Sequence, residues 1–250
     1  MVSPDNTSLT WVLVVVASVV LALLLVNTLF AGSRPYRRFA SFRSSWKRRR
    51  LMRKWLNQSA IFFGSLSVVS LAVGWQHISL LVRDARELPG LNTPWAWLVV
   101  GALTLIALLA PLRFARVTKK GRLQVPRVME LSVLLPRNRQ ELRLTAALGA
   151  NAAVVEELLF RLALPTLVYA VTRNALLALA ISTLLYAGLH AYRGLTGILS
   201  TLLTGALFAA LFVLTGTVLV PILVHGIFEF RTMVAVPVIV GRVHRSKARW

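Results

Sequence analysis

Long runs of apolar residues, separated by shorter polar or basic segments, make up most of this chain. Each run is close to the roughly 20 residues that an α-helix needs to cross the hydrocarbon core of a bilayer. The pattern therefore predicts an all-α, polytopic bundle of transmembrane helices with about seven to eight spans. An eighth span would arise if the long fourth run, or the last run with its two prolines, forms two separate helices. The predicted spans cover residues 9–30, 60–82, 95–112, 144–172, 175–190, 195–214 and 218–240.

The polar segments between the runs set the expected domain organisation. Residues 1–143 would hold the N-terminal membrane helices with their basic cytoplasmic segments, residues 144–240 a helical core, and residues 241–250 a basic cytoplasmic tail. Residues 83–94 are expected to form a short external loop. The apolar stretch 128–135 is too short to span, so we expect it to lie along the membrane surface.

The composition excludes an ordinary soluble domain and restricts the available chemistry. Hydrophobic residues make up 57% of the chain and charged residues 15%, and the mean hydropathy is +0.70. No ordinary soluble domain of this length is so apolar. The chain contains no cysteine, which excludes disulfides and thiolate ligands or nucleophiles. Any chemistry must therefore come from carboxylates, histidines and hydroxyl groups.

The net charge of +21 is concentrated in three segments. Ten Lys or Arg residues lie in the segment 34–54, nine in 113–143, and four after Gly241. Because cytoplasmic loops of membrane proteins are rich in Lys and Arg, we expect these segments on the cytoplasmic side. This topology predicts a multi-pass protein of the cell membrane, with its N-terminus outside and its C-terminus in the cytoplasm.

Two kinds of partner would explain the first basic segment. Its arginines alternate with aromatic residues such as Tyr36, Phe39 and Trp46, as in proteins that bind single-stranded nucleic acid. The segment lies between two predicted spans, however, where anionic lipid head groups attract basic residues and aromatic residues gather at the interface. We therefore expect anionic lipid head groups as partners and no nucleic acid.

Two adjacent glutamates and an arginine interrupt the apolar run at residues 154–165. An ionisable side chain near the centre of a membrane helix costs roughly 2.5 to 3.5 kcal/mol, so it marks a functional site and requires a partner. Arg161 lies four residues after Glu157, and the two can pair along one helix face. Glu156 is rotated by about 100° around the helix and points elsewhere. Small residues earlier in this helix would let neighbouring helices approach closely.

Two further polar pairs have the same helical spacing. Tyr186 and His190 are four residues apart, as are His225 and Glu229, so the members of each pair share a helix face. Three of the eight acidic residues and two of the four histidines therefore lie in the last few helices. This concentration of polar residues in apolar helices predicts a site.

Two chemistries fit these residues, and both hydrolyse an amide. In the first, Glu156 takes a proton from a water molecule that His190 helps to hold. The pair His225 and Glu229 then supplies donors to the developing oxyanion. In the second, His190, His225 and Glu156 bind zinc, which makes a bound water reactive near neutral pH. The two differ in whether a chelator abolishes activity.

Structural roles are the competing interpretation of each polar residue. A Glu and an Arg four residues apart are more often structural than catalytic, so Glu157 and Arg161 are expected to support the site. Tyr186 is expected to pack or to make a supporting hydrogen bond. Isolated histidines in membrane helices can simply bond a backbone carbonyl of the next helix. Three polar pairs in three helices are harder to explain in this way, which favours a functional role for Glu156 and the two histidines.

Three short motifs carry a resemblance to a known family. The segment EELLFR at 156–161 resembles a signature EExxxR, and YAGLH at 186–190 resembles an aromatic residue followed after three residues by histidine. HGIFE at 225–229 is similar to a histidine followed after three residues by asparagine or an acidic residue. In this order, over about residues 144–232, they resemble the CAAX-processing and bacteriocin-processing (CPBP or Abi) intramembrane proteases.

This resemblance implies an all-helical intramembrane endopeptidase whose site opens towards the cytoplasm and the bilayer, with a membrane-associated or hydrophobic peptide as its substrate. By position, Glu156 would activate water, His190 would be its partner, and His225 with Glu229 would form the oxyanion or metal side. The rest of the first motif would brace the site. Family members are described both as metalloproteases and as glutamate-dependent peptidases, so zinc is a possible cofactor; the metal-independent version is favoured here.

Two features of the sequence keep other functions open. Residue 229 is Glu where the family usually has Asn or Asp, and an ionised glutamate cannot donate a hydrogen bond to an oxyanion. His225 also lies less deep than the other site residues when counted from the preceding turn, unless the last helix starts deeper in the membrane or Pro221 distorts it. The alternatives are a catalytically degenerate membrane protein with a peptide-binding, immunity or scaffold role, and a proton-coupled transporter. A transporter would predict symmetric halves, which the sequence does not have.

Overall fold

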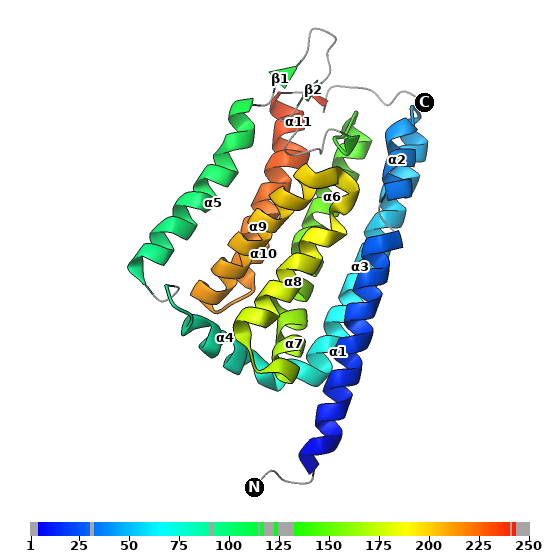
Figure 1. The fold of residues 1–250 in the computed structure, drawn as a ribbon. Helices are drawn as coiled ribbons and strands as arrows, with labels where there is room; N and C mark the ends of the chain where they lie inside the picture. The colour runs from blue at the N-terminus through cyan, green and yellow to red at the C-terminus, as the bar shows by residue number, and fades with distance from the viewer. Residues whose placement is uncertain are drawn as a thin grey trace.

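The computed structural model describes residues 5–30, 33–90, 93–114, 116–117, 123–124, 133–240 and 242–243. Most of its helices lie side by side along one direction and form a bundle, and α4 lies across one end (Figure 1). The strands in these residues, β1 (Arg116–Val117) and β2 (Leu123–Gln124), pair antiparallel over two residues each. Because helices form nearly all of the regular structure in the described residues, the prediction of an all-α helical bundle is confirmed.

The helices follow the chain in two groups. The first group consists of α1 (Asp5–Phe30), α2 (Ser33–Ser41), α3 (Ser45–Gly74), the 3₁₀ turn η1 (Trp75–His77), α4 (Ile78–Arg86) and α5 (Pro94–Phe114). The second consists of α6 (Arg139–Glu157), η4 (Leu158–Ala163), α7 (Leu164–Thr172), α8 (Ala175–Leu189), η5 (Ala191–Arg193), α9 (Gly194–Thr215), α10 (Leu219–Phe230), η6 (Arg231–Ala235) and α11 (Val236–Ile239).

Polar residues and glycine end the helices at the predicted turns. Arg173 ends α7 in a left-handed conformation (φ 54°), and the Asn174 side chain then caps α8 by accepting a hydrogen bond from a backbone N–H of its first turn. Gly216 ends α9 with φ 71°, a conformation that glycine adopts without a steric penalty. At the start of α6, Asn138 accepts hydrogen bonds from two backbone N–H groups.

Two helices contain a π-helical stretch that ends two residues before a proline. The stretch η4 precedes Pro165, and the stretch η6 precedes Pro237. Proline has no backbone N–H and its ring crowds the preceding turn, so the helix widens there instead of continuing regularly. Such π stretches are frequent at functional sites. The first begins directly after Glu157, and the second begins two residues after Glu229.

The number of membrane spans is smaller than predicted. Within the described ranges, the apolar part of α5 at Pro94–Leu109 and the helix α8 at Ala175–Leu189 each have fewer than 18 residues, and α6 with η4 carries several charged residues. Length and charge therefore reduce the expected seven or eight spans to four. The four helical segments that are long and apolar enough to cross a membrane are Thr10–Leu29, Ser45–Arg86, Ala191–Thr215 and Leu219–Ile239.

Three predictions about connecting segments have different outcomes. The expected loop at 83–94 is wrong in its first half, because α4 continues to Arg86, ahead of the breakers Pro89 and Gly90. The expected surface stretch 128–135 is described only from residue 133, and its earlier part lies outside the described residues. The basic tail 241–250 also lies outside them, apart from residues 242 and 243.

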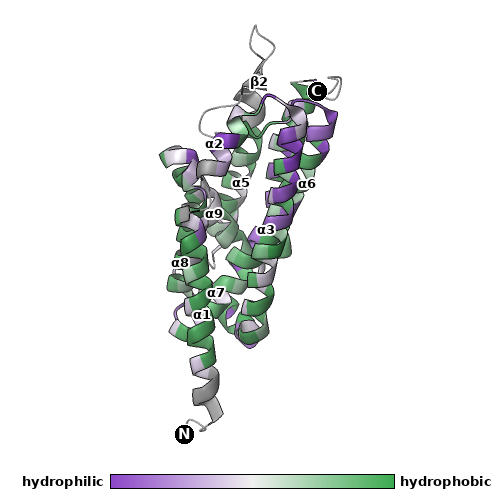
Figure 2. Cartoon of the chain, turned by 90° about the vertical axis from the view of Figure 1, so that its right-hand side faces the viewer, coloured by the Kyte–Doolittle hydropathy of each residue, from purple (hydrophilic) through white to green (hydrophobic). Residues whose placement is uncertain are grey.

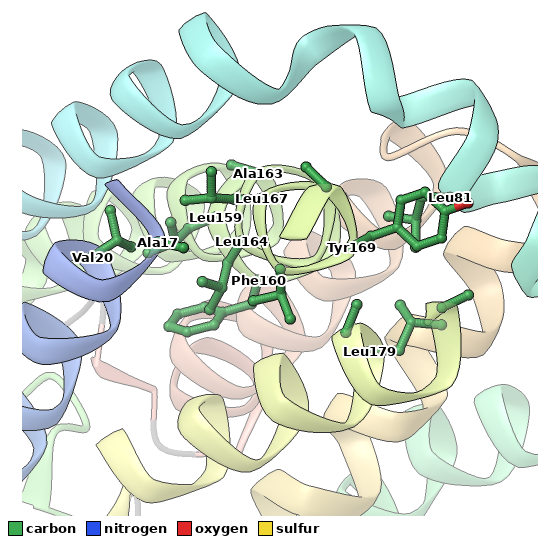
Figure 3. Packing of buried hydrophobic residues seen from close by; sticks show 14 of the residues in the cluster. Ala17, Val20, Leu81, Leu159, Phe160, Ala163, Leu164, Leu167, Tyr169 and Leu179 are labelled. Carbon is green, nitrogen blue, oxygen red and sulfur yellow. The ribbon is translucent and has the colours of Figure 1, made fainter. Parts of the chain in front are cut away.

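The main hydrophobic core surrounds η4 and α7. Leu159, Phe160, Leu164 and Leu167 are fully or almost fully buried there, and residues of α1, α3 and α8 pack around them (Figure 3). Hydrophilic residues gather instead towards one end of the bundle, on α2 and on parts of α3 and α6 (Figure 2). The bundle is therefore apolar over most of its length and polar at the end that α2 occupies.

A buried ion pair fastens the polar end of the bundle. The Arg48 Nε on α3 lies 3.1 Å from Glu141 Oε2 on α6, and both side chains are completely buried. The Arg48 guanidinium also donates to the backbone carbonyls of Val133 and Leu135 and lies 4.0 Å from the centre of the Phe39 ring. This one arginine therefore joins α2, α3, α6 and the segment before α6.

A second buried arginine attaches α5 to the helix that carries His225 and Glu229. Arg231 Nη1 donates to the backbone carbonyls of Ala107 and, at 2.7 Å, of Leu108. Ala107 lies four residues before Pro111, which has no N–H to offer that carbonyl. Arg231 therefore satisfies an acceptor that the proline leaves free.

Candidate active site

The predicted pair Glu157 and Arg161 forms, and both side chains are completely buried. Arg161 Nε lies 3.1 Å from Glu157 Oε2. The Arg161 guanidinium also lies 4.7 Å from the centre of the Tyr186 ring on α8, and its Nη1 donates to the carbonyl of Phe160. Ser182 donates to the same carbonyl at 2.6 Å. The π stretch η4 is therefore held by polar contacts within itself and from α8.

Glu157 also reaches the last of the three motifs. Its Oε1 lies 2.9 Å from His225 Nδ1, and the histidine is buried on α10. The His225 ring stacks on Phe208 of α9, with ring centres 5.0 Å apart. One carboxylate thus joins the first and third motifs, although they are 68 residues apart in the chain. The sequence predicted a bracing role for Glu157 but not this contact.

His190 occupies the end of α8 and is also buried. Its Nδ1 lies 2.9 Å from the backbone oxygen of Tyr186, one turn earlier, and its ring packs edge-on against the Tyr186 ring. If this nitrogen donates, the other ring nitrogen, Nε2, is left as an acceptor. The contact therefore orients the imidazole and leaves its second ring nitrogen free of this hydrogen bond.

Glu156 and Glu229 complete the polar cluster. Glu156, in the last turn of α6, interacts electrostatically with His225, Glu229 and Glu157. Glu229 lies on α10, with its Oε1 3.9 Å from His225 Nε2. His190 in turn interacts electrostatically with His225. The structure therefore brings all three motifs into one region, although in its described part His190 makes no hydrogen bond to Glu156 or His225.

A close approach of two helices positions Glu229. A Cβ atom added at Gly149 of α6 would lie 2.9 Å from the Cβ of Glu229, closer than real side chains come. At Gly226, an added Cβ would lie 3.8 Å from the Cβ of Ala153. The small residues of α6 therefore allow close packing of α10, as the sequence predicted. The packing also shows that His225 is not too shallow in its helix to join the site, because its Nδ1 lies 2.9 Å from Glu157 Oε1.

Sequence reasoning missed one residue of this cluster. Arg193 lies in η5, three residues after His190, and it interacts electrostatically with Glu229 and Tyr186. Its charge also acts on Glu156 and on His190. The only signal in the sequence was its place in the short connection that follows the second motif, where it appeared as one more basic residue of the cytoplasmic side.

The arrangement of these residues also bears on the expected zinc site. In the described ranges, no group of three or more His, Asp or Glu side chains is placed so that it could hold a metal ion. One nitrogen of each site histidine is engaged, His190 Nδ1 with a backbone oxygen and His225 Nδ1 with Glu157. The ligand group that the described ranges lack, and not these two contacts, argues against the zinc site expected at Glu156, His190 and His225. A metal-bound histidine commonly donates its other N–H to a carboxylate or a backbone carbonyl, and these contacts leave Nε2 of each histidine open.

Comparison with known proteins gives one match. Residues 138–231 match the family model described as type II CAAX prenyl endopeptidase Rce1-like, and this range includes all three motifs. The match confirms the resemblance that the motifs carry. Neither a curated protein nor a solved structure matches the chain.

Proposed function

We propose, from the premise that residues 138–231 belong to the CAAX-protease-like family of intramembrane endopeptidases, that this membrane protein hydrolyses peptide bonds of membrane-associated or hydrophobic peptides. The observation that carries the proposal is the buried contact between Glu157 and His225, which brings the first and third motifs together beside Glu156. A merely structural ion pair between Glu157 and Arg161 would not require a histidine from another helix.

In the proposed reaction, Glu156 is the base. It takes a proton from water while the water oxygen bonds to the carbonyl carbon of the scissile amide, and the carbonyl electron pair moves onto the oxygen. When this tetrahedral intermediate collapses, the electron pair returns and the C–N bond breaks. The leaving nitrogen then takes the proton from Glu156, so the products are a carboxyl terminus and an amine.

The other site residues orient this chemistry. His190 would hold the attacking water through Nε2, because its Nδ1 already lies against the Tyr186 backbone oxygen. Glu157 would fix the ring of His225, and Arg161 would neutralise Glu157 within the apolar core. Tyr186 would support both sides, because its ring lies against His190 and Arg161.

The orientation of the protein in the membrane is part of the proposal. His190 and η5 lie at the end of the bundle that α2 occupies, and Tyr36 of α2 packs against Tyr192 with ring centres 5.1 Å apart. Lys and Arg are concentrated in α2 and the start of α3. The bias of basic residues towards the cytoplasm would place this end inside, facing anionic lipid head groups, with the start of α1 outside.

The test is cleavage of a panel of hydrophobic peptides by the purified protein in lipid vesicles. Glu156→Gln removes the base with little change of shape, and we expect kcat to fall by about 10²-fold or more. Glu87→Gln, an exposed carboxylate on the connection after α4, is the matched control and should leave cleavage unchanged. Full activity of the Glu156→Gln protein would overturn the mechanism. A chelator and elemental analysis of the same sample then test the zinc alternative.

One observation favours a second candidate, a catalytically degenerate peptide-binding protein. Glu229 stands where the family usually has Asn or Asp, and its carboxylate lies near His225. Such a protein would bind the peptides of the same panel without cleaving any of them. Binding without turnover, unchanged by Glu156→Gln, would therefore favour this candidate over the peptidase.

A further inference from the structure

The cluster contains three carboxylates but few donors that remain available. Nδ1 of His225 faces Glu157 at 2.9 Å, and its Nε2 faces Glu229 at 3.9 Å. An N–H on either nitrogen is therefore directed towards a carboxylate. Glu229 in its ionised form is an acceptor only. Addition of water to an amide nevertheless creates a negative oxygen, which requires a donor or a positive charge beside it.

Arg193 is placed to supply that charge. Its backbone N–H donates to the carbonyl of His190 at 3.0 Å, which closes the 3₁₀ turn η5. In a 3₁₀ turn, residues three apart lie on the same side, so the side chains of Arg193 and His190 start from one face. A Cβ added at Gly197 would lie 2.2 Å from the Cβ of Arg193 and 3.2 Å from the His190 oxygen. The start of α9 is thus packed tightly against this turn.

The surroundings of Arg193 differ from those of Arg48 and Arg161, the two arginines that are completely buried in the described part of the chain. Arg48 and Arg161 each form an ion pair with a completely buried glutamate. Arg193 forms none with any residue that the structure describes, although its charge acts on both Glu156 and Glu229. Its Nε donates to the Tyr192 hydroxyl at 3.1 Å. This leaves the guanidinium a half-buried cation in the site, with its terminal nitrogens uncommitted to a carboxylate.

We propose that Arg193 is a catalytic residue that stabilises the oxyanion of the tetrahedral intermediate, a task for which the ionised form of Glu229 has no donor. This inference rests on the proposed peptidase function and deepens it. Guanidinium is suited to the task because it carries only donors and keeps its charge at any physiological pH. The hydrogen bond from Nε to Tyr192, whose ring lies 6.0 Å from that of His190, holds the cation beside the histidine.

The first experiment measures kcat and KM for Arg193→Gln and Arg193→Lys on the best peptide of the panel. Loss of an oxyanion partner lowers kcat by about 10² to 10³-fold and leaves KM almost unchanged, because the contact forms only in the transition state. Lysine keeps the charge, so it should retain part of the rate. The matched control is Arg139→Gln, an exposed arginine at the start of α6, which should leave both constants unchanged.

The departure at residue 229 provides a sharper test. Asparagine at this position can donate a hydrogen bond, so Glu229→Asn should restore at least about tenfold of the kcat that Arg193→Gln loses. If Arg193 only balances the charge of Glu156 and Glu229, or only holds η5 in place, the added asparagine has no oxyanion to serve. Absence of rescue, or a loss confined to KM, would overturn the inference.

A binding measurement separates this inference from the proposed function. A hydrophobic peptide carrying a phosphinate, an anionic tetrahedral mimic of the intermediate, is compared with the same peptide carrying an amide. The wild-type protein should bind the phosphinate at least about tenfold more tightly, and Arg193→Gln should abolish this preference. Equal binding of the two peptides by the wild type would contradict the role of Arg193. Failure to cleave any peptide, with the preference intact, would contradict the peptidase function alone.

Discussion

Glu157 Oε1 lies 2.9 Å from His225 Nδ1, and Glu157 Oε2 lies 3.1 Å from Arg161 Nε, so one carboxylate holds a histidine and an arginine at once. The second glutamate of EELLFR is thus the hub of the cluster, and the first glutamate keeps its carboxylate for another role. Because Glu157 and Arg161 are completely buried, removing one charge leaves the other without compensation.

Glu157→Gln should therefore destabilise the protein more than any exposed substitution. Loss of one partner from a buried ion pair costs about 3 to 5 kcal/mol, and glutamine offers one acceptor oxygen where the carboxylate offers one each to His225 and Arg161. The measurement is thermal unfolding in detergent micelles, with Glu87→Gln as the exposed control. A midpoint equal to that of the control would show that the ion pair contributes nothing to the stability of the bundle.

Gly149→Ala should push α10 away from α6. The new Cβ would lie 2.9 Å from the Cβ of Glu229, and such overpacking costs about 1 to 3 kcal/mol. The control is Gly64→Ala on α3, where an added Cβ meets no atom within 4 Å and helix propensity favours alanine by about 0.5 to 1 kcal/mol. Opposite signs of the two changes in unfolding free energy are expected. Equal effects would mean that α6 and α10 are not in close contact.

Arg48→Ala should open the segment that precedes α6. Arg48 donates to the carbonyls of Val133 and Leu135 and pairs with Glu141, so its loss frees two acceptors and a buried carboxylate. Hydrogen exchange in residues 133–141 should rise by about tenfold or more relative to wild type, because local opening becomes easier. Arg53→Ala, an exposed arginine of the same helix, should leave exchange in this segment unchanged.

Arg231→Gln should loosen α5 from the rest of the bundle. The substitution removes the donor for the Ala107 carbonyl, which Pro111 leaves without an intrahelical partner. Hydrogen exchange across residues 94–109 should rise, while exchange in α7 should not change. The matched substitution is Arg143→Gln on the exposed face of α6. An α5 that exchanges as slowly in the Arg231→Gln protein as in the control would contradict this attachment.

Several features of the fold follow from local sequence. The apolar runs predict helices because a chain in a bilayer must satisfy its backbone hydrogen bonds internally. Turns at Arg173 and Gly216, and the pairing of Glu157 with Arg161 four residues later, depend only on neighbouring residues. The motifs predicted the resemblance that the family-model match over residues 138–231 also finds. The span count was overestimated because short apolar runs were counted as spans, such as the run at 175–190 that forms the 15-residue helix α8.

The assembly of the site was decided by tertiary structure. No periodicity in the sequence indicates that Glu157 would face His225, which comes from a helix 68 residues away, or that Gly149 would admit Glu229. In the sequence, Arg193 is one more basic residue in a cytoplasmic connection. In the structure, the turn η5 after α8 brings it close to the polar cluster. Sequence alone determined which residues are too polar for an apolar helix, because that cost is local. Only packing decided which of them meet, because contacts between helices depend on the shapes of both surfaces.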